Sequence, residues 1–172
     1  MENASKALLM AGSVLIAIMI ISALVIMYNK LNATQEQEEA NSRAEKILEF
    51  NLSYESFNRK DVYGGQLLSL INKMEDNNTK YTQLDEKEYI MDISVTFTME
   101  DKYFQKKEYN LEEMTQLLAN ATTEQLTDIR RKLFKCGDAS GKKQIDYSRS
   151  TGRVKKMYFI EINPQDYQVN KQ

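Results

Sequence analysis

The sequence predicts an α+β protein, in which a long N-terminal transmembrane helix precedes a small domain with a three- or four-stranded antiparallel sheet and short helices. One supporting observation is the stretch between Lys6 and Lys30, which contains no charged side chain. Another is the polar segment that follows, up to Phe50, which lacks Gly and Pro and is rich in helix-forming residues. The third is an alternation of apolar and polar residues from Tyr89 to Met99, which is typical of a strand with one buried face.

After a short tail (residues 1–6), residues 7–29 (ALLMAGSVLIAIMIISALVIMYN) predict the membrane helix. A helix needs about 20 apolar residues to cross a hydrocarbon core that is ~30 Å thick. A cleaved signal peptide is the alternative, but its apolar core is usually only about 7–15 residues long. No A-x-A cleavage site follows the apolar run. A buried helix of a soluble protein would need equally apolar partners, which the rest of the chain lacks. We therefore expect a retained, single-pass anchor in the cell membrane.

Residues 30–50 predict a helical extension of this anchor into water. A thin apolar stripe recurs at helical spacing at Ala33, Ala40, Ala44 and Ile47. The alternative is a helix break at the membrane surface, near Asn29-Lys30 or Asn32. Continuity is the simpler interpretation, because no helix-breaking residue interrupts the segment.

The α+β domain is expected over residues 51–163, followed by a polar tail at 164–172. After Gly64-Gly65, a short amphipathic helix is expected to end at Asn77-Asn78. Its buried face should consist of Leu67, Leu70, Ile71 and Met74. The alternating segment Tyr89–Met99 predicts the main strand, with its second face largely in water. Residues 103–109 predict a weaker strand that pairs with it.

Two helices are then expected. The first is Leu111–Ala121, after the cap residue Asn110, and the second starts at Thr122 or Thr123 and extends to Phe134. The end of the domain predicts a hairpin, in which strands Gln144–Arg149 and Arg153–Ile162 flank a turn at Ser150-Thr151-Gly152. In the last strand, one face should carry Val154, Tyr158, Ile160 and Ile162, and the other should carry Met157 and Phe159.

Composition excludes several function classes. The net charge is -2, from 23 basic and 25 acidic residues, which gives no electrostatic basis for nucleic-acid binding. The chain has no His and one Cys, so His-based catalysis, cysteine metal clusters and intrachain disulfides are excluded. Cys136 is the best candidate nucleophile, because Arg131, Lys132 and Lys135 lie nearby in sequence and could lower its pKa. Without His it has no usual general base, and a packing role is the better interpretation. We expect no enzyme activity, cofactor, metal or small-molecule substrate.

Small residues at four-residue spacing mark a candidate packing surface on the anchor. They are Ala7, Ala11, Ser13 and Ala17. Such pairs let two helices approach closely in lipid. The predicted partners are therefore membrane lipid and, through the anchor helix, further copies of the chain or other proteins.

The opening ENASKALLMAGSVLIAIMIISALVIMYN resembles the N-terminus of small, uncharacterised single-pass membrane proteins of clostridia and related Gram-positive bacteria. The stretches Val62-Tyr63-Gly64 to Leu70-Ile71-Asn72 and Thr151-Gly152-Arg153-Val154 are similar to the rest of that pattern. This resemblance implies a membrane location and no activity.

The layout also resembles that of a type IV pilin or pseudopilin, in which a half-apolar N-terminal helix packs in a fibre and carries a small sheet domain. The Gly-Phe prepilin cleavage motif and the Glu at the fifth position of the apolar segment are absent. The layout implies a pilin-like or secretion-apparatus subunit with an extracellular domain. The alternative is a membrane-tethered binding or adaptor module that faces the cytoplasm, because the few flanking Lys and Arg residues do not decide the orientation.

Overall fold

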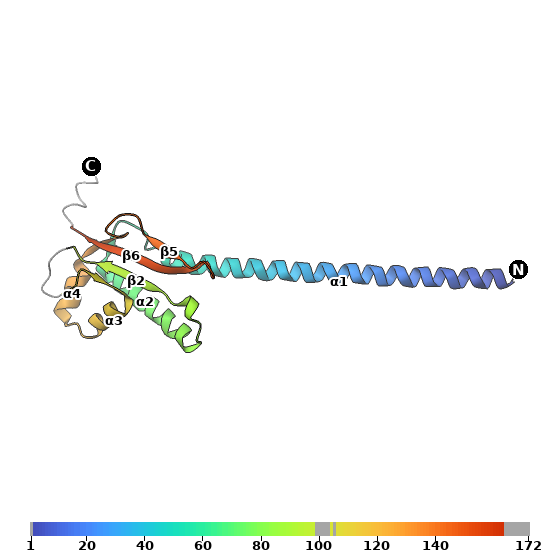
Figure 1. Ribbon diagram of the computed structural model, residues 1–172, viewed down its shortest axis with the longest axis horizontal. Coiled ribbons are helices and arrows are strands. Elements are labelled where there is room, and N and C mark those ends of the chain that lie inside the picture. The colour runs from blue at the N-terminus through green and yellow to red at the C-terminus, as the bar shows by residue number, and fades with distance from the viewer. Residues whose placement is uncertain (1, 99–103, 105, 164–172) are drawn as a thin grey trace. The chain divides into compact units, whose positions relative to one another are not determined.

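The computed structural model describes residues 2–98, 104 and 106–163. The predicted tail at 164–172 lies outside these residues, as do residues 103 and 105 of the strand predicted at 103–109. Among the described residues of that segment, only Glu108 and Tyr109 form a strand. The chain divides into two compact units, residues 1–46 and 47–172. Figure 1 shows the elements of both units in chain order.

Helix α1 (Glu2–Glu55) is continuous through the apolar and the polar segments. The predicted continuity is confirmed, and no break occurs at Asn29-Lys30 or Asn32. The helix begins within the predicted N-terminal tail. It ends where the chain tightens into a turn, because the amides of Phe57 and Asn58 donate to Tyr54 O and Glu55 O at 3.0 and 2.8 Å.

A buried side-chain amide, that of Asn51, bonds the last turns of α1 to the rest of the second unit. Asn51 is 9% exposed. Its Nδ2 donates to Gly152 O, and its Oδ1 accepts from Val154 N, both at 2.9 Å. The Asn51 side chain therefore satisfies two backbone groups beside the final hairpin, as a neighbouring strand would. Tyr54, one turn later, is fully buried in the core.

Within the described residues the sheet has six strands, namely β1 (Val62–Tyr63), β2 (Asp92–Thr96), β3 (Glu108–Tyr109), β4 (Leu133–Cys136), β5 (Ile145–Tyr147) and β6 (Val154–Ile162). Their order is β1-β4-β6-β2-β3, with β5 also paired to β6. Strands β2 and β6 are parallel, whereas the other pairs are antiparallel. The α+β class is confirmed, but the predicted three- or four-stranded antiparallel sheet is wrong in strand number and direction.

Two short strands account for the missed pairings. Strand β1 has only two residues, which is too short for a periodic pattern. Strand β4 begins inside the helix predicted over Thr123–Phe134, which was extended that far because Leu126, Ile129 and Leu133 fit a helical face. Helix α4 (Thr123–Arg131) instead stops at Lys132, whose ψ of 152° is extended. The chain then enters the sheet between β1 and β6.

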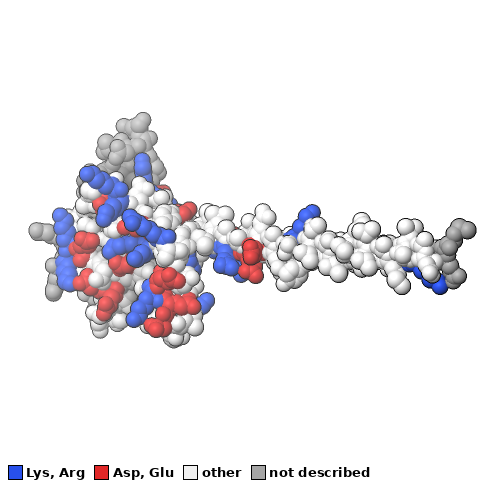
Figure 2. All heavy atoms as spheres, turned by 45° about the vertical axis from the view of Figure 1, so that its right-hand side comes forward, with Lys and Arg blue, Asp and Glu red and all other residues white. Residues whose placement is uncertain are grey.

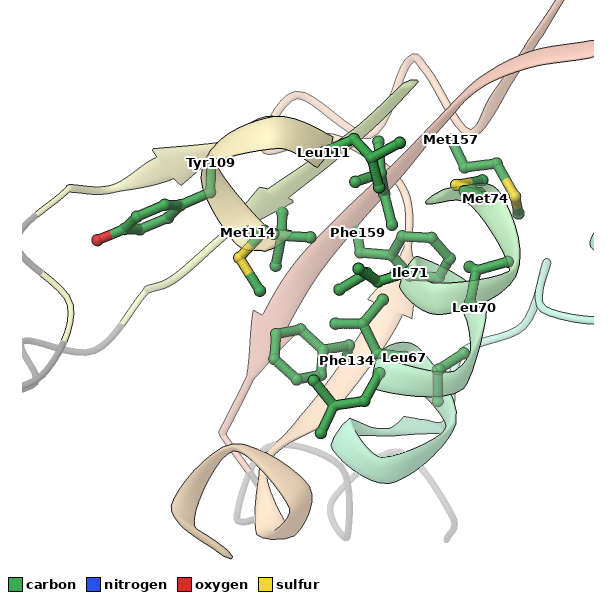
Figure 3. Packing of buried hydrophobic residues seen from close by; sticks show 14 of the residues in the cluster. Leu67, Leu70, Ile71, Met74, Tyr109, Leu111, Met114, Phe134, Met157 and Phe159 are labelled. Atoms are coloured by element: carbon green, nitrogen blue, oxygen red, sulfur yellow. The ribbon is translucent and has the colours of Figure 1, made fainter. Parts of the chain in front are cut away.

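The core lies between the sheet and its helices (Figure 3). Helix α2 (Gly64–Gln83) buries the predicted face, and each of its four residues is 0% exposed. These residues pack against Phe134 of β4 and against Met157 and Phe159 of β6, while helix α3 (Leu111–Ala119) adds Leu111 and Met114. The apolar alternation of the main strand is confirmed, since Met91, Ile93, Val95 and Phe97 are all buried.

Two details of the sequence pattern are wrong. The second face of β2 is not wet, since Ser94 and Thr96 are 4% and 8% exposed. In β6 the predicted division of faces agrees with the structure, because Met157 and Phe159 are buried whereas Tyr158, Ile160 and Ile162 are half-buried; Val154, predicted with the latter, is buried. Helix α2 runs past Asn78 to Gln83, because the Asn78 amide bonds to the backbone of Met91 and leaves the helix intact. A short 3-10 helix, η1 (Lys87–Tyr89), follows.

Candidate functional site

The first candidate site is the apolar surface of α1. Large apolar side chains are exposed along it, with Leu8 at 79% and Met19 at 72%. Figure 2 shows this stretch without acidic or basic side chains between Lys6 and Lys30. Within the described residues, α1 is the one helix that is long and apolar enough to cross a membrane. The apolar window is 0% buried, unlike that of a core helix, whereas a signal sequence near the N-terminus can meet the same length and composition criteria.

The four predicted packing residues lie on two faces of this helix. Successive residues of an α-helix are rotated by about 100°, so Ala7 and Ala11 share one face. Ser13 and Ala17 share another, about 120° away around the axis. The Ser13 hydroxyl donates to Met10 O within the helix at 2.8 Å, so its polar group is satisfied without a partner helix. The structure thus offers two separate surfaces for close helix approach.

A second candidate is a groove on the outer side of the helices, which the sequence did not predict. It consists of two adjoining hollows of about 500 and 410 Å³ that share Glu75 and Thr115. We call it the helix groove, and its walls come from α2, α3 and α4. Leu68, Leu118 and Leu126 supply apolar surface at one end. Leu126 belongs to the apolar face predicted for residues 123–134, whereas Leu68 lies beside the face predicted for α2.

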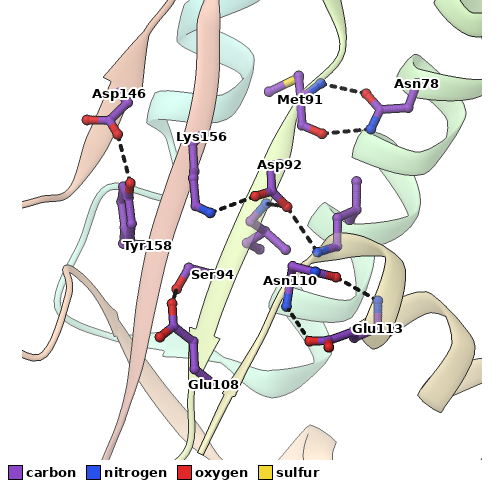
Figure 4. A network of polar contacts seen from close by, with 12 residues as sticks. Asn78, Met91, Asp92, Ser94, Glu108, Asn110, Glu113, Asp146, Lys156 and Tyr158 are labelled. Carbon is purple, nitrogen blue, oxygen red and sulfur yellow. Dashed lines mark hydrogen bonds and ion pairs between the residues drawn. The ribbon is translucent and has the colours of Figure 1, made fainter.

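Figure 4 shows polar contacts that join several elements of the domain. Asp92 of β2 pairs with Lys156 of β6 at 2.6 Å. The other carboxylate oxygen of Asp92 accepts from the amides of Ile93 and Leu111 at 2.8 and 3.1 Å. Asn110 caps α3 by accepting from Glu113 N at 2.9 Å. These residues orient β2, α3 and β6 against one another, which is a structural role.

Cys136 is buried in β4, and its Sγ lies 3.5 Å from Gln144 O. Burial raises the pKa of the Cys136 thiol to about 11. Lys132, a candidate for lowering that pKa, pairs instead with Glu161 at 2.8 Å. At neutral pH the sulfur is therefore protonated, and the reactive thiolate is scarce.

The folded chain should consequently resist thiol modification at neutral pH. We expect Cys136 to react with a maleimide only after denaturation, because the sulfur is both buried and protonated. A Ser140→Cys variant in a Cys136→Ser background is the matched control, since Ser140 is exposed in the loop before β5. Mass spectrometry of the labelled protein measures both sites. Equal labelling of the two cysteines in the native protein would contradict the buried placement.

Among the described residues, no three His, Cys, Asp or Glu side chains gather as potential metal ligands. Comparisons with protein-family models, curated proteins and solved structures found no match. Function must therefore be argued from two features, the exposed apolar helix and the domain that follows it.

Proposed function

We propose that this chain is a membrane-anchored structural or assembly subunit, comparable to a pilin-like or secretion-apparatus component. Residues 7–29 cross the cell membrane once, and the α+β domain lies outside the cell. The chain performs no catalysis and takes no cofactor.

The observation that carries this proposal is the exposed apolar surface of α1. Leaving that many apolar side chains in water costs about 25 cal/mol for each Å². Lipid or the helices of other copies remove this cost. The small residues on two faces permit close approach between helices, where van der Waals packing drives association in lipid.

The test enlarges one small residue on each face. We expect Ala11→Leu or Ala17→Leu to weaken association of the full chain in membranes by about tenfold, which corresponds to ~1.4 kcal/mol. The leucine keeps the helix apolar but holds the partner backbone away. Crosslinking of the protein in isolated membranes measures the oligomer fraction, and testing each variant alone shows which face is used.

Ala23→Leu is the matched control. It makes the same substitution in the same helix, on a face that carries neither pair, at least about 100° from both. Oligomers that are reduced equally by all three variants would indicate a general effect of helix bulk. Oligomers that are unchanged in both Ala11→Leu and Ala17→Leu would remove the proposed packing surfaces.

A further inference from the structure

The helix groove has an acidic and polar wall that extends along α2. On the α2 side its lining runs from Gly65 to Gln83, and on the α3 side from Leu111 to Ala119. The carboxylates of Glu75 and Glu112 line the groove, and both side chains are exposed. At the junction of the two hollows, the buried Thr115 Oγ1 has no hydrogen-bond partner. A buried hydroxyl without a partner is unfavourable, so an occupant that bonds to Thr115 would be stabilised.

The helix groove and the β5–β6 hairpin differ in charge. The lining of the groove carries two carboxylates, Glu75 and Glu112, and one cation, Arg130. Residues 142–156, which form the β5–β6 hairpin and its approach, contain six basic side chains and one acidic side chain. None of these hairpin residues lines the helix groove. The two surfaces are therefore distinct and opposite in charge.

The hairpin presents cations that the domain itself leaves available. Lys156 is paired with Asp92, and the Arg153 guanidinium lies 3.5 Å from the centre of the Phe50 ring. By contrast, Lys142, Arg149 and Lys155 are exposed, and in the described part of the chain no ion pair involves them. Arg149 lies in the hairpin tip.

The hairpin tip, residues 148–152, is held in one conformation before any partner binds. Ser148 N donates to Arg153 O at 2.8 Å, and Gly152 N donates to Ser148 O at 2.9 Å. Gly152 has a φ of +69°, which a glycine adopts without steric cost. A preorganised tip loses little conformational entropy on docking.

We propose that the helix groove receives the β5–β6 hairpin tip of a second copy of this chain. Arg149 and Lys155 of one copy face Glu75 and Glu112 of the next. Because the groove and the hairpin are different surfaces, the contact is heterologous. A row of such copies has a free groove at one end and a free hairpin at the other. This inference rests on the proposed assembly role, to which it adds a contact between the α+β domains.

Disulfide trapping between two differently tagged full-length chains tests the contact in membranes. Both chains carry Cys136→Ser; one carries Thr79→Cys in the groove wall, and the other carries Ser150→Cys in the hairpin tip. We expect a mixed disulfide when the two are co-expressed, and at least tenfold less when Asn58→Cys replaces Ser150→Cys. Asn58 is exposed in the loop after α1. No mixed disulfide, or equal yields with Asn58→Cys, would overturn the proposal.

Charge reversal tests the chemistry of the same contact. Glu75→Lys with Glu112→Lys in the Thr79→Cys chain should reduce the mixed disulfide about tenfold. Arg149→Glu with Lys155→Glu in the Ser150→Cys chain should restore it, and added salt should weaken the native contact. A reversal without effect, or a reversal that is not rescued, would overturn the proposed pairing. Anchor-dependent oligomers that persist without the mixed disulfide would leave the assembly role intact and remove only this contact.

Discussion

Gly64→Ala should destabilise the domain by at least ~3 kcal/mol, whereas Gly65→Ala should leave its stability nearly unchanged or slightly higher. Gly64 opens α2 beside the last turn of α4, and its amide donates to Lys132 O at 2.9 Å. A Cβ atom at Gly64 would lie well inside van der Waals contact of the Ile129 carbonyl. Backbone atoms cannot move aside as a flexible side chain can, so the strain reaches the upper part of the range for overpacking.

Gly65 provides the matched control for this prediction. A Cβ atom there meets only the side chain of Arg130, at 4.0 Å. Because Ala favours the helical state over Gly by roughly 0.5–1 kcal/mol, Gly65→Ala should be neutral or stabilising. Denaturant unfolding of the full chain in detergent, followed by circular dichroism, measures both variants. Similar midpoints for the two would contradict the close approach of α2 and α4.

Glu161→Gln should cost about 3 kcal/mol of stability, because it removes one partner of a buried ion pair. Glu161 is 3% exposed. Its carboxylate pairs with Lys132 Nζ at 2.8 Å and accepts from Thr98 N at 3.1 Å. It thus joins β6, the residue before β4 and the segment after β2. The neutral amide removes the shorter of two carboxylate contacts of Lys132 and keeps the longer one, to Asp128 at 3.7 Å.

Lys156→Met is the control for the buried pair. It breaks the Lys156–Asp92 pair, whose side chains are 30% and 40% exposed. Such partly solvated pairs contribute at most about 1 kcal/mol, so this variant should lose far less stability than Glu161→Gln. The same unfolding measurement compares the two. Equal losses would contradict the special contribution assigned to Glu161.

Periodicity predicted the parts of the fold that have long, regular patterns. The continuous N-terminal helix, the buried face of α2 and the core residues of β2 all follow from spacings that persist over several residues. The parallel pairing of β2 with β6 could not be predicted in this way. It joins segments about 60 residues apart, with register Asp92 to Lys156, and pairing partners leave no periodic signal in either strand.

The candidate surfaces were less predictable than the fold. The spacing of small residues in the anchor predicted a packing surface. Their division into two faces becomes clear only when the positions of Ser13 and Ala11 around the helix axis are compared. The helix groove depends on how α2, α3 and α4 pack, so neither its shape nor the position of Thr115 can be read from one segment. From the sequence, Lys132 is close enough to Cys136 to lower the pKa of its thiol. Only the tertiary structure shows that Lys132 pairs with Glu161 instead.

The most direct test of the central proposal asks whether α1 crosses the membrane once with the domain outside. Asn3→Cys and Ser140→Cys are introduced separately in a Cys136→Ser background, and cells that express each variant receive an impermeant maleimide. Both positions are exposed, before and after the apolar stretch respectively. We predict that Ser140→Cys is labelled on intact cells and that Asn3→Cys is labelled only after permeabilisation. Labelling of both positions from the same side would contradict a single span, and the reverse pattern would place the domain inside and favour a tethered cytoplasmic module.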